Sequence, residues 1–149
     1  MTVMNDDDHV ARIEGILPHR WDLDALRSGA AVCATLAVPF RIVAAIVDSD
    51  SGGLNALFFV LFVAFFVVGA GCAAWVQRTG TPLSHALVTA IGTYAFVEIV
   101  FVAIRLVRGT QIPWFSIFFT LSVISAAGVI GGFLGSRLQA QGFVPSSRR

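Results

Sequence analysis

The chain has few charged residues and contains no lysine. Of its 149 residues, 13% are charged, whereas a soluble domain carries about 25%. All ten basic residues are arginines, and the formal net charge is +1. Because this balance offers no basic surface to a polyanion, we expect no nucleic-acid partner.

Residues that carry common chemistry are also scarce. The two cysteines, Cys33 and Cys72, form no C-x-x-C pair, and we interpret them as small packing residues. Only one histidine, His85, lies near an apolar run, whereas haem held within a membrane needs two facing ligands. The sequence has no H-E-x-x-H motif, nucleophile elbow or phosphate loop. We therefore expect no metal, no cofactor and no enzymatic activity.

What the chain has instead is long apolar segments. Hydrophobic residues make up 56% of it, and the mean hydropathy is +0.82. Each of four runs is long enough to cross a hydrocarbon core of about 30 Å as a helix of roughly 20 residues. The runs cover residues 25–47, 54–76, 83–107 and 113–136. The sequence predicts an all-α integral membrane protein with four transmembrane helices in a lipid bilayer.

The remaining segments set the domain organisation. Residues 1–23 form an N-terminal segment that predicts either a short interfacial amphipathic helix or a partly ordered tail. Residues 24–137 form the transmembrane domain, and residues 138–149 form a C-terminal tail. Pro39 interrupts the first run, which we interpret as a retained span rather than a cleaved signal peptide.

Short loops and the placement of arginine predict the topology. Short connections make neighbouring spans antiparallel, which gives an up-down-up-down four-helix bundle. Arg105 and Arg108 then lie on one side of the membrane. The side of the termini holds Arg12, Arg20, Arg27, Arg78, Arg137, Arg148 and Arg149. Since cytoplasmic segments carry the excess of basic residues, both termini are expected in the cytoplasm.

The composition indicates the source of the protein. Arginine without lysine, with abundant alanine, valine and glycine, suggests a GC-rich bacterial genome, so the expected location is the bacterial cytoplasmic membrane.

Two segments of the sequence form a weak internal echo. "GAGCAAWVQR" and "GVIGGFLGSR" align Gly69 with Gly128 and Arg78 with Arg137. The echo indicates either two duplicated helical hairpins or drift in apolar sequence.

Charged residues inside the runs are the strongest candidates for a site. Glu98 and Arg41 lie in the second halves of two runs that cross in the same direction, so we expect them at equal depth. A charge in hydrocarbon costs a few kcal/mol unless it is paired or hydrated. Arg41 is therefore the first candidate partner of Glu98, and Arg105 is the second. Tyr94, one turn before Glu98, is placed to donate a hydrogen bond to its carboxylate.

Small residues at a spacing of four form the other signal. They occur in the second and fourth runs as Gly69-x-x-x-Ala73, Gly128-x-x-x-Gly132 and Gly131-x-x-x-Gly135. Such pairs allow close approach of helices in lipid. We expect packing within the bundle, with homodimerisation through the fourth span left open.

Parts of the chain resemble small four-span bacterial membrane proteins of uncharacterised function. The similar segments are "VVGAGCAAWVQRTGTPLSHALVTAIGTY" and "SAAGVIGGFLGSR". The matching positions are Gly69, Gly71, Arg78, Gly80, Gly128, Gly131 and Gly132. Ser84 and His85 stand where that group tends to have histidine and glycine. The resemblance implies a fold and no biochemical activity.

Two functions fit these patterns. The first is a non-enzymatic accessory or assembly component that packs through its glycine-rich helix faces, with other membrane proteins or a second copy as partners. The second is a small homodimeric ion- or proton-coupled transporter that uses Glu98, since ionisable groups within membranes mark transport sites. A strong bond to Arg41 favours the first, because a transport site needs a carboxylate that is free to change its protonation state.

Overall fold

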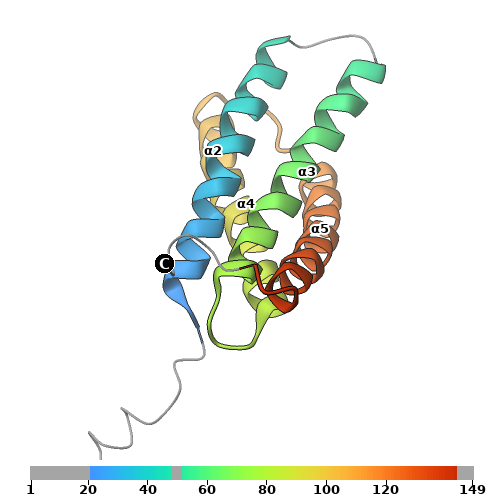
Figure 1. Cartoon of the computed structure of the whole chain (residues 1–149). Coiled ribbons are helices and arrows are strands. Elements are labelled where there is room, and N and C mark those ends of the chain that lie inside the picture. The colour runs from blue at the N-terminus through green and yellow to red at the C-terminus, as the bar shows by residue number, and fades with distance from the viewer. Residues whose placement is uncertain (1–20, 48–51, 144–149) are drawn as a thin grey trace, which may run out of the picture.

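The computed structural model describes residues 21–47 and 52–143, which form four α-helices (Figure 1). They are α2 (Leu23–Val47), α3 (Gly52–Val76), α4 (Pro82–Val107) and α5 (Trp114–Ala140). Each is long and apolar enough to cross a membrane. The predicted class, an all-α four-helix bundle of a multi-pass membrane protein, is confirmed. The predicted N-terminal amphipathic helix lies outside the described residues.

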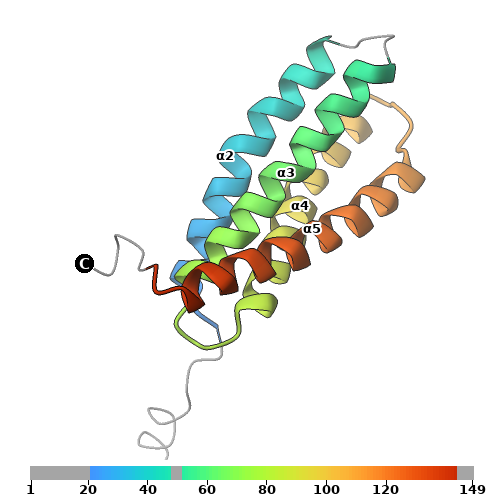
Figure 2. The ribbon, with the colours of Figure 1, turned by 45° about the vertical axis from the view of Figure 1, so that its right-hand side comes forward.

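The helices run antiparallel, so each end of the bundle collects four helix ends (Figures 1 and 2). We call the end that holds Leu23, Val76, Pro82 and Ala140 the terminal end, and the opposite end the distal end. Helix α3 packs against α2, α4 and α5. Among the described residues, α2 and α5 do not pack against each other, and Figure 2 shows them diverging toward the distal end.

The last helix is longer than the sequence predicted. Helix α5 continues to Ala140, so the expected tail over residues 138–149 begins as helix. Gln139 explains the extension, because its side-chain nitrogen donates to the main-chain carbonyl of Gln77 at 2.9 Å. The helix ends before Gly142, whose φ of +81° suits glycine.

Small residues form the interior of α2, a pattern that the sequence analysis missed. Ala25, Gly29, Cys33 and Ala37 recur every fourth residue, and all four are buried. A β-carbon added at Gly29 would lie 2.6 Å from that of Ala73. Helices α2 and α3 therefore approach closely at this point.

The glycines of α5 face two different helices. Gly128 and Gly132 pack against Ala86 and Ala90 of α4. The second pair, Gly131 and Gly135, packs against α3, where added β-carbons would overlap the carbonyl oxygens of Val67 and Gly71. Both glycine motifs of this helix are therefore used inside the bundle.

The second helix of each hairpin uses a glycine in the same way. Gly69 packs against Cys33 of α2, and Gly128 packs against Ala90 of α4. Each glycine thus contacts the helix that precedes its own in the chain. The internal echo has a structural counterpart here, while duplication stays a prediction.

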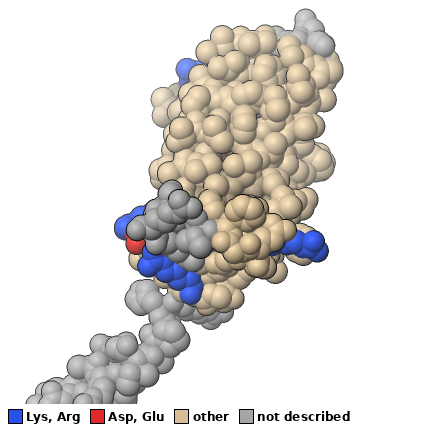
Figure 3. Space-filling model, viewed as in Figure 1, with Lys and Arg blue, Asp and Glu red and all other residues tan. Residues whose placement is uncertain are grey.

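The outer surface matches a lipid environment. On the face shown in Figure 3, charged side chains lie toward the two ends of the bundle, and the band between them carries none. Large apolar side chains in the middle of α4 and α5 are also exposed, including Phe96, Ile99, Val129 and Ile130. Such a surface is stable in lipid and would aggregate in water.

Candidate functional site

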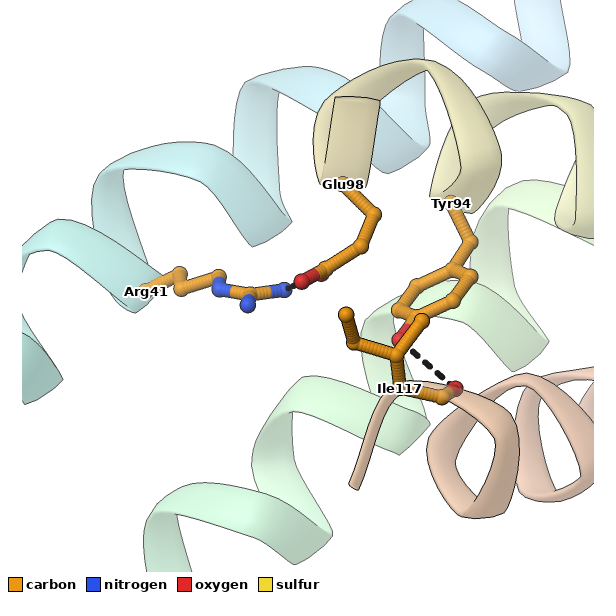
Figure 4. Close-up of polar contacts among 4 residues, drawn as sticks. All are labelled: Arg41, Tyr94, Glu98 and Ile117. Atoms are coloured by element: carbon orange, nitrogen blue, oxygen red, sulfur yellow. Dashed lines mark hydrogen bonds and ion pairs between the residues drawn. The ribbon is translucent and has the colours of Figure 1, made fainter. Parts of the chain in front are cut away.

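An ion pair joins α2 to α4 in the distal half of the bundle. Nη1 of Arg41 lies 2.7 Å from Oε2 of Glu98 (Figure 4). The Glu98 side chain is 6% exposed and that of Arg41 is 24% exposed. The partner is the one that matched depth predicted, since α2 and α4 cross in the same direction. The role of the pair stays a prediction.

The pair is a single contact rather than a bidentate one. One guanidinium nitrogen contacts one carboxylate oxygen. Among the described residues, no group is oriented to donate a hydrogen bond to Oε2. The guanidinium carbon also lies 4.6 Å from the ring centroid of Phe101 and 5.9 Å from that of Phe62. Both distances are within the range of a cation–π interaction. Arg41 is therefore held by a carboxylate and two aromatic rings together.

Tyr94 has a different partner from the one expected. Its hydroxyl donates to the main-chain carbonyl of Ile117 in α5, at 3.1 Å, instead of to the carboxylate of Glu98 (Figure 4). The long tyrosine side chain reaches across to α5, whereas the shorter Glu98 turns toward α2. Two neighbouring residues of α4 thus bind two opposite helices.

A cavity of about 250 Å³ lies beside the ion pair at the distal end. All four helices contribute to its lining, which includes Arg41, Tyr94 and Glu98. Arg105, the second candidate partner of Glu98, lines this cavity without forming an ion pair among the described residues. The rest of the lining combines aromatic rings of α2 and α3 with polar groups such as Asn55 and Thr120.

Sequence reasoning missed Asn55 and Thr120 as parts of the site. Each is a polar residue within an apolar run, at the distal end of its helix. This signal was available, but a single amide or hydroxyl is common in membrane spans because it also binds neighbouring backbone or helices. Only the fold shows that both face one cavity with Glu98.

A second polar cluster, also missed, closes the terminal end. His85 is fully buried, and its Nε2 accepts the main-chain N–H of Asp22 at 2.9 Å. Its Nδ1 lies 2.9 Å from the carbonyl oxygen of Thr81, so this nitrogen carries the proton and donates. The side-chain oxygen of the buried Gln77 accepts the N–H groups of Thr79 and Thr81. This cluster ties α2 to the α3–α4 connection.

The fold and the site define a class and no closer relative. Over its described residues, the chain is an all-α, four-helix, multi-pass membrane protein with an ion pair beside a cavity in its distal half. Comparison with protein-family models, with curated proteins and with solved structures gave no match. The resemblance to small four-span bacterial membrane proteins stays a prediction.

Proposed function

We propose that the protein is a non-enzymatic accessory component of a membrane assembly, located in the bacterial cytoplasmic membrane with both termini in the cytoplasm. The observation that supports this most is the direct Arg41–Glu98 contact, because Glu98 is already neutralised by a partner of its own chain. Such a pair fixes which helices touch.

The glycines at the helix contacts are used within this chain. Gly69, Gly128, Gly131, Gly132 and Gly135 all contact neighbouring helices of the same chain. A partner protein or a second copy would therefore bind other surfaces, such as the exposed faces of α2 or α5.

A double-mutant cycle tests the structural role of the pair. Arg41→Gln and Glu98→Gln should each lower the free energy of unfolding by roughly 2–5 kcal/mol, since each leaves a charge without its partner. The double variant should recover more than half of that loss. Unfolding is measured in detergent by circular dichroism, with Arg108→Gln, an exposed arginine of the distal end, as the control.

The cavity supports a second candidate, a small homodimeric ion- or proton-coupled transporter. Glu98 and Arg41 both line it, and their contact is a single one that hydration from the cavity would weaken. Proton-coupled flux into liposomes separates the two candidates. Flux that disappears in Glu98→Gln and persists in Arg108→Gln would contradict the accessory role.

A further inference from the structure

We propose that the distal end binds a single-chain amphiphile with a monoanionic head, of the chemical class of a long-chain carboxylate. Its head would lie in the cavity beside Arg105, and its chain would lie in an apolar groove between α4 and α5. The proposal concerns binding alone, and it holds for an accessory protein as well as for a transporter.

The charge balance of the cavity argues for an anionic head. Its described lining contains two guanidinium groups, Arg41 and Arg105, and one carboxylate, Glu98. Arg41 is paired with Glu98, while Arg105 has no carboxylate within ion-pair distance among the described residues. Among the described lining residues, one positive charge is therefore left without a counterion in a partly apolar cavity. Because a guanidinium binds a carboxylate through two parallel hydrogen bonds, a carboxylate is a suitable counterion.

The same balance limits the head to one negative charge. A monoanion neutralises the surplus charge of Arg105, whereas a dianion would add net negative charge near Glu98. The start of α5 adds to the attraction, because Pro113 stands at its N-cap, lines the cavity and has no side-chain acceptor for the first N–H groups. Such a helix start carries partial positive charge.

The groove supplies room for a hydrocarbon chain. It has a volume of about 410 Å³ and runs between α4 and α5. Apart from Tyr94 and Glu98, its lining is apolar and consists of Ala95, Ile99, Val102, Ala103, Leu106, Trp114, Ile117 and Leu121. Trp114 and Leu106 are both more than half exposed, so the groove opens to the lipid side.

The cavity and the groove are neighbours. Tyr94, Glu98 and Ile117 line both, so the two spaces meet at one contact between α4 and α5. A charged space beside an apolar one is the pattern that an amphiphile complements. Lipid tails are as apolar as the groove, so the head determines the affinity and the groove determines the orientation of the chain.

Trp114 provides a direct probe of occupancy. The chain has three tryptophans, so Trp21→Phe together with Trp75→Phe leaves Trp114 as the single one. Both replaced residues lie at the terminal end, away from the cavity and the groove. The protein is placed in nanodiscs of phosphatidylcholine and titrated with ω-bromododecanoate, whose bromine quenches indole fluorescence. Quenching should saturate with this anion. The matched cation, ω-bromododecyltrimethylammonium, should quench only in proportion to its partition into lipid.

Two matched variants test the head. Arg105→Gln should weaken the saturable phase by about tenfold or more, because it removes a charge-assisted hydrogen bond. Arg108→Gln, which removes the same charge outside the cavity, should bind as the parent does. Equal binding by these two variants, or saturation by the cation, would overturn the proposal.

A third variant tests the groove. Ala103→Phe fills the groove from an exposed position of α4 and should abolish the saturable phase while circular dichroism and thermal unfolding stay as in the parent. Unchanged quenching in this variant would overturn the assignment of the chain to the groove. The same spectra would detect a loss of helical structure in Ala103→Phe. In that case the smaller substitution Ala103→Leu is used instead: loss of the saturable phase supports the groove, and unchanged quenching overturns it.

Discussion

At the residue scale, glycine sets how closely the helices approach. In a helix, glycine is about 1 kcal/mol less favourable than alanine, so its use needs a compensating contact. Gly131 has that contact, because an added β-carbon would overlap the carbonyl oxygen of Val67 and lie 3.0 Å from the β-carbon of Ala70. A β-carbon added at Gly92 of α4 would meet no atom within 4 Å beyond its chain neighbours and the nearby backbone of its own helix.

The two glycines should therefore respond oppositely to the same substitution. Gly131→Ala should destabilise the bundle by about 1–3 kcal/mol, because α3 and α5 would have to separate. Gly92→Ala should stabilise it by about 0.5–1 kcal/mol through helix propensity and a less flexible unfolded chain. Unfolding by sodium dodecyl sulfate, followed by circular dichroism, measures both. A loss of similar size at both positions would contradict the assignment of Gly131 to a tight contact.

The residues of the site differ in how far the sequence could predict them. Glu98 and Arg41 were predictable as partners, because two charges in hydrocarbon at matched depth need each other. The partner of Tyr94 was not, because helical spacing places it near Glu98 and says nothing of the carbonyl of Ile117 in another helix. His85 was a similar case, since its partner is a main-chain N–H that any residue at position 22 except proline would supply.

At the element scale, α2 is held near each end by a polar contact. Near its distal end Arg41 binds Glu98, and at its start Asp22 joins it to the rest of the bundle. One carboxylate oxygen of Asp22 accepts the N–H of Ala25 at 3.1 Å, and the other accepts the N–H of Arg78 at 3.1 Å. Asp22 thus caps α2 and fixes it to the residues that follow α3.

Loss of this cap should loosen the first turn of α2. Asp22→Ala should cost about 1–2 kcal/mol, since it removes the cap and the acceptor for Arg78. Asp24→Ala, two residues further on at an exposed site, removes the same charge and should cost less than 1 kcal/mol. Amide hydrogen exchange of residues 24–27 in detergent reports the difference. Equal exchange in the two variants would show that only the negative charge near the helix start matters.

Hydropathy predicted the four helices correctly, but it predicted the residues at which they end less accurately. Runs of this length have one stable form in lipid, because a helix satisfies its own backbone hydrogen bonds. The end of α5 was misplaced because "SRLQA" is polar and looks like a tail. Its helix continues through tertiary contacts, in which Gln139 binds the carbonyl of Gln77. Hydropathy carries no information about such contacts.

At the scale of the whole molecule, the described arginines outside the apolar band lie at both ends. Arg27, Arg78 and Arg137 belong to the terminal end, and Arg105 and Arg108 belong to the distal end. This distribution is compatible with an apolar band between two polar rims (Figure 3). The short connections predicted that neighbouring helices are antiparallel, and the fold confirms this order. The fold is the same whichever side of the membrane each rim faces. The predicted orientation therefore rests on the distribution of charge alone.

Cysteine labelling in intact bacterial cells tests this orientation. In a chain with Cys33→Ala and Cys72→Ala, a single cysteine is introduced at the distal end as Gln111→Cys or at the terminal end as Ala140→Cys, both at exposed positions. A membrane-impermeant maleimide should label Gln111→Cys in intact cells and Ala140→Cys only after lysis. The physical reason is that the basic residues near the termini resist translocation across the membrane. The reverse pattern would place the termini outside and would turn the distal cavity, with Arg105, toward the cytoplasm. The proposed amphiphile would then have to reach the cavity from the cytoplasmic leaflet.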